Sequence, residues 1–181
     1  MPRYIAFLRA INVGGNTVKM DALCAPFEAL DLEDVKSFIA SGNVIFEAQR
    51  GTPASLEKKI EMALADALGY RVDTFLRTPG EVAAIARCAV VEPSLRAEAV
   101  ALNVGFLKAP LGGPALEALQ AMQTEIDDFR VDGREVYWVC RVKQSESKFS
   151  GGLFERKLGV RVTFRGINTL ERLLVKHPLE V

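Results

Sequence analysis

The chain is poor in the side chains that most often build metal and catalytic centres. It has one histidine, His177, and three widely spaced cysteines, Cys24, Cys88 and Cys140, with no CxxC pair. A zinc site needs several such ligands at short spacing, and a histidine-based triad needs a histidine held within the fold. We therefore expect neither a metal nor a cofactor, and we interpret the thiols as buried groups in a reducing compartment.

Net charge and long apolar runs are absent as well. Lys+Arg and Asp+Glu both number 23, so the overall balance indicates neither nucleic acid nor a membrane as a partner. The apolar run YIAFL is short and Arg9 follows it, unlike a signal peptide, and no stretch approaches the roughly 20 apolar residues of a membrane span. We therefore expect a cytoplasmic protein.

The first half of the chain shows an alternation of strand and helix patterns. It is predicted to run strand, helix, strand, strand, helix, strand, with these segments in order: RYIAFLRAI, a helix from Met20, the hairpin DVKSFIASGNVIFEA with its turn at Ser41-Gly42-Asn43, a helix from Thr52-Pro53 to Gly69, and RVDTFLR. Asn16 or Thr17 can cap the first helix. The segment Thr78-Pro79-Gly80-Glu81 has the spacing of a capping box and predicts a connecting helix.

The second half repeats this order. It contains AVALNVGFLKA, a helix with Leu116 and Leu119, a hairpin turning at Asp132-Gly133, a helix from about Ser147 or, because of its glycine pair, from about Gly152, the strand RVTFR, and a last helix that Asn168 can cap. Local echoes such as LGYRVDTF and LGVRVTF support a duplication. We predict an α+β protein built from two ferredoxin-like βαββαβ halves in one compact body, residues 1–78 and 98–181, with a helical connector at 79–97.

Several strands are apolar on both alternating faces, as in YIAFL and VYWV. A ferredoxin-like unit covers only one face of its sheet with its own two helices. We therefore expect the second face to be covered by the other half, by the extra helices or by another chain. Because Tyr137 and Trp138 are adjacent on a strand, they face opposite ways and do not form the aromatic platform of an RNA-binding module.

Four segments carry a family resemblance: RYIAFLRAINVGGN, Lys19-Met20, SGNVIFEA and the C-terminal pattern SK…LGV…T.R..NT. With these, the chain resembles a widespread, mostly bacterial family known as a domain of unknown function, number sixteen-ninety-seven. The resemblance spans nearly the whole chain and implies an α+β fold of duplicated ferredoxin-like units, but no activity. The family usually has glycine where Ala10 stands and tryptophan or a similar residue near Gly166.

Polar and basic residues fall at the predicted strand ends and helix starts. Arg9, Arg77 and Arg165 lie at or near strand ends, whereas Lys19 and Lys148 lie near helix starts, where the dipole does not favour a cation. A glycine pair before a helix is compatible with an anion-binding loop, although neither GxxxxGK[ST] nor GxGxxG is present. The predicted ligand-binding set is Arg9, Asn12, Gly14, Gly15, Lys19, Ser41, Asn43, Lys148 and Arg165.

Two functions stay open at this point. The first is binding of a small anion, such as a phosphate, nucleotide or carboxylate, by that set, and no catalytic residue stands out. The second is a non-enzymatic interaction or oligomerisation module, in which the same residues form turns, caps and salt bridges, for example from Arg9 to Asp73. Charge is uneven in the second half, with nine Lys/Arg against three Asp/Glu in residues 141–176. This asymmetry fits either a local anion site or contact with a sister subunit.

Overall fold

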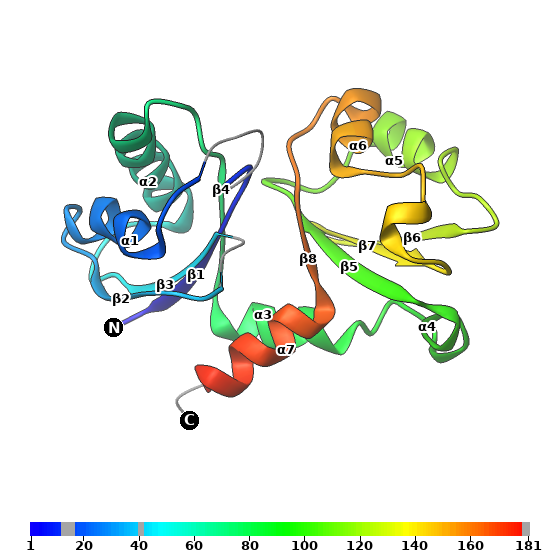
Figure 1. The fold of residues 1–181 in the computed structure, drawn as a ribbon, viewed down its shortest axis with the longest axis horizontal. Coiled ribbons are helices and arrows are strands. Elements are labelled where there is room, and N and C mark those ends of the chain that lie inside the picture. The colour runs from blue at the N-terminus through cyan, green and yellow to red at the C-terminus, as the bar shows by residue number, and fades with distance from the viewer. Residues whose placement is uncertain (12–16, 40–41, 179–181) are drawn as a thin grey trace. The chain divides into compact units, whose positions relative to one another are not determined.

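The computed structural model describes residues 1–11, 17–39 and 42–178. These residues form a mixed α+β fold with two four-stranded antiparallel sheets and seven α-helices (Figure 1). The chain divides into two compact units, Met1–Glu81 and Val82–Val181. Asn12, Gly14, Gly15 and Ser41, four members of the predicted ligand-binding set, lie outside the described residues.

The first unit contains one sheet and two helices that lie on the same face of it (Figure 1). Its elements are β1 (Arg3–Leu8), α1 (Met20–Glu28), β2 (Glu33–Ser37), β3 (Asn43–Glu47), α2 (Pro53–Leu68) and β4 (Thr74–Arg77). The strands lie in the order β2-β3-β1-β4 and every neighbouring pair is antiparallel. The strand and helix order predicted from the sequence is present.

Both faces of β1 are buried. Tyr4, Ala6 and Leu8 belong to the core that packs under the helices, and the intervening Ile5 and Phe7 are also buried. Successive side chains of a strand point to opposite faces, so the continuous apolar run YIAFL places apolar groups on each side of the sheet.

Helix α2 begins and ends at the residues that its sequence indicated. The Oγ1 atom of Thr52 accepts a hydrogen bond from the backbone N–H of Ser55 at 3.2 Å, and Gly69 ends the helix with a left-handed φ of 79°. Two glutamates of α2 also reach the outer edge of β4. Glu61 accepts from the N–H of Thr74 at 2.9 Å, and Glu57 accepts from the N–H of Leu76 at 3.0 Å.

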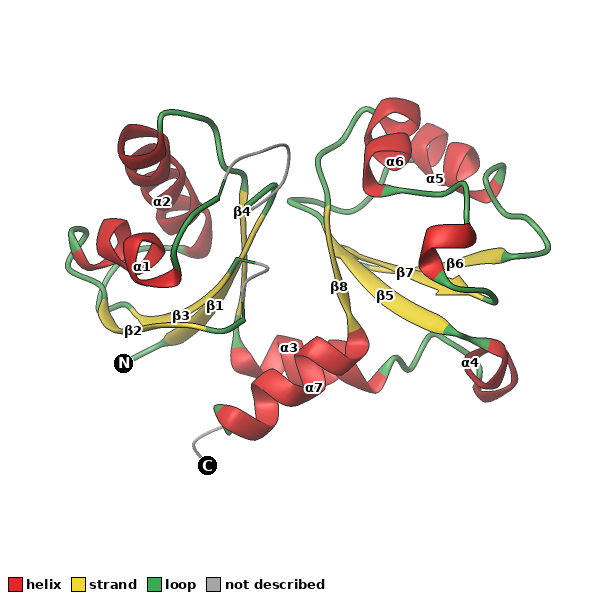
Figure 2. Cartoon of the chain, in the orientation of Figure 1, coloured by secondary structure: helices red, strands yellow, loops and turns green. Residues whose placement is uncertain are grey.

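The second unit has the equivalent strand order, β6-β7-β5-β8, again all antiparallel (Figure 2). It comprises most of α3 (Pro79–Arg87), then α4 (Pro93–Glu98), β5 (Ala101–Phe106), α5 (Gly113–Gln120), β6 (Asp127–Asp132), β7 (Glu135–Cys140), the 3-10 helix η1 (Gln144–Glu146), α6 (Gly151–Leu158), β8 (Thr163–Gly166) and α7 (Ile167–Lys176). Helices α5 and α6 lie together on one face of this sheet (Figure 1).

An aromatic cluster fills the space under α5 and α6. The ring of Phe149 lies 4.7 Å from that of Trp138 and 5.8 Å from that of Phe164, measured between centroids. The indole N–H of Trp138 donates to Asp127 at 2.8 Å, and the Ser147 hydroxyl donates to the same carboxylate. This buried carboxylate therefore ties β6, β7 and the segment before α6 together.

The opposite face of this sheet is covered by a connecting helix, one of the coverings expected from the sequence. The hydroxyl of Tyr137 donates to the carbonyl of Ile85 in α3 at 3.3 Å, and burial raises the pKa of this phenol. The capping box at the start of α3 is also confirmed, because Thr78 and Glu81 exchange side-chain and backbone hydrogen bonds.

Two predicted helix caps are corrected, and the later of the two starts considered for α6 is confirmed to within one residue. Helix α6 begins at Gly151, next to the start near Gly152 that its glycine pair indicated and not at Ser147, and its cap is Ser150, whose hydroxyl accepts from the N–H of Leu153. Thr17 does not cap α1, which begins at Met20 as predicted but follows Lys19 without a side-chain cap, and the other predicted cap, Asn16, lies outside the described residues. Asn168 does not cap α7 either, since that helix starts at Ile167 and Asn168 lies within it.

Within the part of the chain that the structure describes, no helix has the length and apolar character needed to cross a membrane.

Candidate functional site

The carboxyl end of β1 carries a buried carboxylate between two arginines. Asp73 is only 3% exposed, and its Oδ1 accepts from Nε and Nη2 of Arg71 at 3.1 and 2.8 Å. Its Oδ2 lies 3.8 Å from Nη1 of Arg9, and the Arg9 N–H donates to the Asp73 carbonyl at 2.9 Å. The ion pair considered as the alternative role of Arg9 is therefore present.

The backbone around this strand end is unusual. Ala10 has a φ of 62° and Ile39 a φ of 50°, in the left-handed region that costs residues other than glycine energy. The glycine that the family resemblance places at Ala10 has a physical reason in this φ. Gly42 also has a positive φ, and a Cβ there would lie 3.1 Å from the Ile11 side chain, so the hairpin turn packs closely on the end of β1.

Lys19 and Asn43, two further predicted residues of this unit, have different surroundings. Lys19 is exposed at the N-terminus of α1. Asn43 is fully buried, and its side-chain N–H donates to the carbonyl of Phe38 at 2.9 Å, which holds the β2–β3 hairpin. Asn43 therefore contributes to the turn itself.

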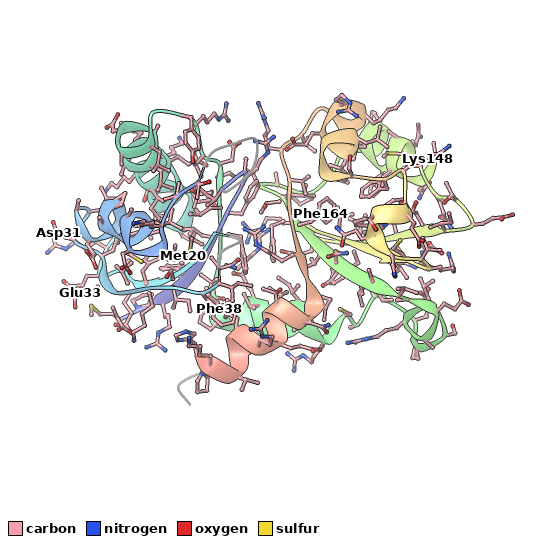
Figure 3. All side chains as sticks on the ribbon, in the orientation of Figure 1. Met20, Asp31, Glu33, Phe38, Lys148 and Phe164 are labelled. Atoms are coloured by element: carbon pink, nitrogen blue, oxygen red, sulfur yellow. The ribbon has the colours of Figure 1, made fainter. Side chains whose placement is uncertain are left out.

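The remaining predicted residues, Lys148 and Arg165, belong to the second unit. Lys148 is exposed on the segment between η1 and α6 (Figure 3). Arg165 is buried, with Nη1 donating to Thr163 Oγ1 at 2.7 Å and to the Phe164 carbonyl at 2.9 Å. Burial lowers the pKa of Arg165 to about 10. Its side chain lies on the sheet face that Thr163 and Val104 share, opposite α5 and α6.

A cavity of about 380 Å³ opens directly after Arg165, where α7 begins. We call it the α7 cavity. It lies between the end of α4, the start of β5 and the first residues of α7, and it is lined by Arg96, Ala99, Val100, Ala101, Leu102, Asn103, Gly166, Ile167 and Asn168.

The polar groups of the α7 cavity come from three elements. Gly166 precedes α7 without any side-chain cap, so the first N–H groups of the helix have no side-chain acceptor. Arg96 of α4 donates to the Arg87 carbonyl at 3.2 Å and lies 3.6 Å from Glu171 of α7. Asn103 of β5 is only 7% exposed, and its amide N–H donates to Gln144 at 3.4 Å.

Arg96 and Asn103 are not among the site residues predicted from the sequence. Arg96 sits on an exposed helical turn, where an arginine is ordinary. Asn103 left a detectable signal, because an amide within the apolar strand ALNVGF must find partners once it is buried.

The other titratable groups give no indication of a reactive centre. Burial raises the pKa values of the Cys88 and Cys140 thiols, which keeps these groups protonated and poorly nucleophilic. Among the described residues, no three His, Cys, Asp or Glu side chains are grouped so that they could hold a metal ion.

Comparison with known proteins supplies a family and a fold. The solved structure of the conserved bacterial protein SP0830 from Streptococcus pneumoniae is similar over 95% of this chain and 96% of its own, with a TM-score of 0.73 and 22% identity. At this identity the likeness concerns the fold alone. No curated protein matches the chain. The profile of the family described as "Protein of unknown function (DUF1697)" matches residues 1–137 of the 181, and the chain therefore belongs to this family.

Proposed function

We propose that the protein binds a small anionic ligand, and that the α7 cavity is where it binds. The observation that carries this proposal is the uncapped start of α7 inside a cavity of about 380 Å³. The N–H groups of a helix N-terminus and the helix dipole both favour negative charge, and clefts of this size hold small metabolites. Arg96 adds a cation to the same wall.

Glu171 opposes this attraction in part, because its carboxylate lies 3.6 Å from the guanidinium of Arg96. The pair is half exposed, so solvent weakens its effect. The main anion contacts are therefore assigned to the backbone N–H groups at the start of α7.

A comparison of the start of α7 with the equivalent helix start in the first unit supports this location. We infer that the two units are ferredoxin-like copies related by duplication, supported by their equivalent strand orders. Arg77 pairs with Ile5 in the first sheet, and Arg165 pairs with Val104 at the equivalent place in the second. The residues that follow these arginines, Thr78 and Gly166, therefore occupy equivalent positions in the two units. Thr78 caps α3 with its hydroxyl, whereas Gly166 leaves α7 uncapped and the cavity open.

The proposal is tested by giving α7 the missing cap. Gly166→Ser suits the extended backbone there (φ −64°, ψ 143°), and its Cβ would lie 3.7 Å from Asn103 Oδ1, an ordinary contact. We expect the serine to preserve or raise stability, since serine is a better cap than glycine by a few tenths of a kcal/mol. It should also remove the thermal shift that phosphate or small carboxylates produce in the unchanged protein.

Gly112→Ser is the matched control. Gly112 is the N-cap residue of α5, as Gly166 is of α7, and it also provides no side-chain cap. A Cβ at Gly112 meets nothing within 4 Å. This variant should keep the anion response. If no anion stabilises the unchanged protein, or if both serine variants respond equally, anion binding at α7 is refuted.

The strand-end cluster of Arg9, Arg71 and Asp73 is a second candidate anion site, together with the predicted Lys19. It is favoured by one observation: the guanidinium groups of Arg9 and Arg71 converge on the single carboxylate of Asp73, which leaves a local excess of positive charge. Arg71→Gln should weaken an anion response that arises here and leave a response at α7 unchanged. If neither site binds anions, the interaction module becomes the better proposal, and sedimentation would then ask whether the chain forms homo-oligomers.

A further inference from the structure

We propose that the α7 cavity selects a small carboxylate with a hydrogen-bond donor on the adjacent carbon, that is, an α-hydroxy or α-amino acid. This inference rests on the proposed anion site and adds the class of ligand. It starts from Asn103, a residue that the anion proposal leaves unused.

Asn103 presents an acceptor to the α7 cavity that no described residue uses. It is 93% buried, which follows from its 7% exposure, and its side-chain N–H donates to Gln144 at 3.4 Å. No hydrogen bond from any other described residue reaches its Oδ1. This oxygen is not among the fully enclosed polar atoms, so solvent in the cavity reaches it, and a ligand that supplies a donor takes the place of that solvent.

This oxygen lies beside the proposed anion position. Asn103 pairs with Gly166 across β5 and β8, and its Oδ1 lies 3.7 Å from the place that a Cβ on Gly166 would occupy. The first N–H groups of α7 follow immediately after Gly166. A carboxylate on these N–H groups therefore brings a substituent on its α-carbon next to Oδ1.

The rest of the cavity suits a small ligand with a short apolar part. Val100, Leu102 and Ile167 are among the lining residues, and the volume of about 380 Å³ is near the lower end for metabolite sites.

The test compares L-lactate with propionate, which have the same charge and carbon chain but differ in the α-hydroxyl. Each is titrated into ¹⁵N-labelled protein while the backbone amides of residues 167–169 and the side-chain amide of Asn103 are followed. We expect lactate to bind about tenfold more tightly than propionate, the ratio that corresponds to one net hydrogen bond. L-Alanine should follow lactate, since its ammonium group also donates.

Asn103→Leu should bring the lactate affinity down to that of propionate and leave propionate unchanged, while Gly166→Ser should abolish both. Equal binding of lactate and propionate to the unchanged protein overturns the donor selection but leaves the anion site standing. Binding of inorganic phosphate without lactate overturns the carboxylate class. If none of these ions shifts the α7 amides at up to roughly 50 mM, the anion site itself fails, and this inference with it.

Discussion

Replacing Gly105 by alanine is expected to destabilise the second unit by about 1–2 kcal/mol. A Cβ at Gly105 would lie 2.8 Å from Val162 Cγ2 and 2.8 Å from Phe164 Cε1. Carbon atoms pack at about 3.5–4.0 Å, so these groups must move apart by roughly 0.7 Å or more. The β-branched Val162 is stiff, and the Phe164 ring lies in the aromatic cluster, so neither yields freely.

The expected magnitude combines two effects of opposite sign. Overpacking of a filled core costs about 1–3 kcal/mol, whereas alanine gains about 0.5–1 kcal/mol over glycine in a strand. Gly113→Ala is the matched control, because a Cβ at this first residue of α5 meets nothing within 4 Å. The control should be neutral or stabilising.

The assay is urea unfolding followed by the fluorescence of Trp138, the single tryptophan of the chain, which reports on the second unit. For a domain of this size, 1–2 kcal/mol lowers the midpoint by about 1 M. If Gly105→Ala unfolds at the same urea concentration as the unchanged protein, or at a higher one, the close approach of β5 to Phe164 does not constrain this position, and the reasoning is refuted.

Two further predictions concern a phenol and a helix cap. Burial raises the pKa of Tyr137, so the native phenol keeps its proton above pH 10, whereas the phenol of the unfolded chain, with a pKa of about 10, releases it. The free energy of unfolding should therefore fall as pH rises past 10, by up to about 1.4 kcal/mol per pH unit. Tyr137→Phe should show a shallower fall in urea titrations between pH 9 and 11, and equal slopes would contradict the assignment. Thr52→Ala should cost about 1 kcal/mol by circular dichroism because the cap on Ser55 is lost, whereas Thr52→Ser should retain most of that stability.

The fold was largely predictable because its local signals agree with one another. The apolar alternation of YIAFL predicts a strand buried on both faces, and Thr52 and Gly69 mark the two ends of α2, as the structure has them. The start of α7 was mispredicted because Asn168 has the type and spacing of a cap. The tight continuation of β8 through Gly166 into the helix instead leaves Asn168 in the first turn.

The α7 cavity could not be predicted from the sequence in the same way. Its polar residues come from α4, β5 and α7, and they meet only because β5 pairs with β8. The left-handed φ of Ala10 was equally hidden, since alanine gives no local signal for that conformation. The strand asparagine Asn103 was the one clue that a burial argument could have used.

The outer edges of the first sheet bear on how this protein can assemble. An open edge strand offers its N–H and C=O groups to other chains and is a common start of edge-to-edge aggregation. On β4, the carboxylates of Glu57 and Glu61 already occupy the outward N–H groups of Leu76 and Thr74. On β2, the charged residues Glu33, Asp34 and Lys36 and a register irregularity interrupt the other edge. An incoming strand would have to displace these charges at either edge, so copies of this chain would associate through side-chain surfaces and not through a continuous sheet of the first unit.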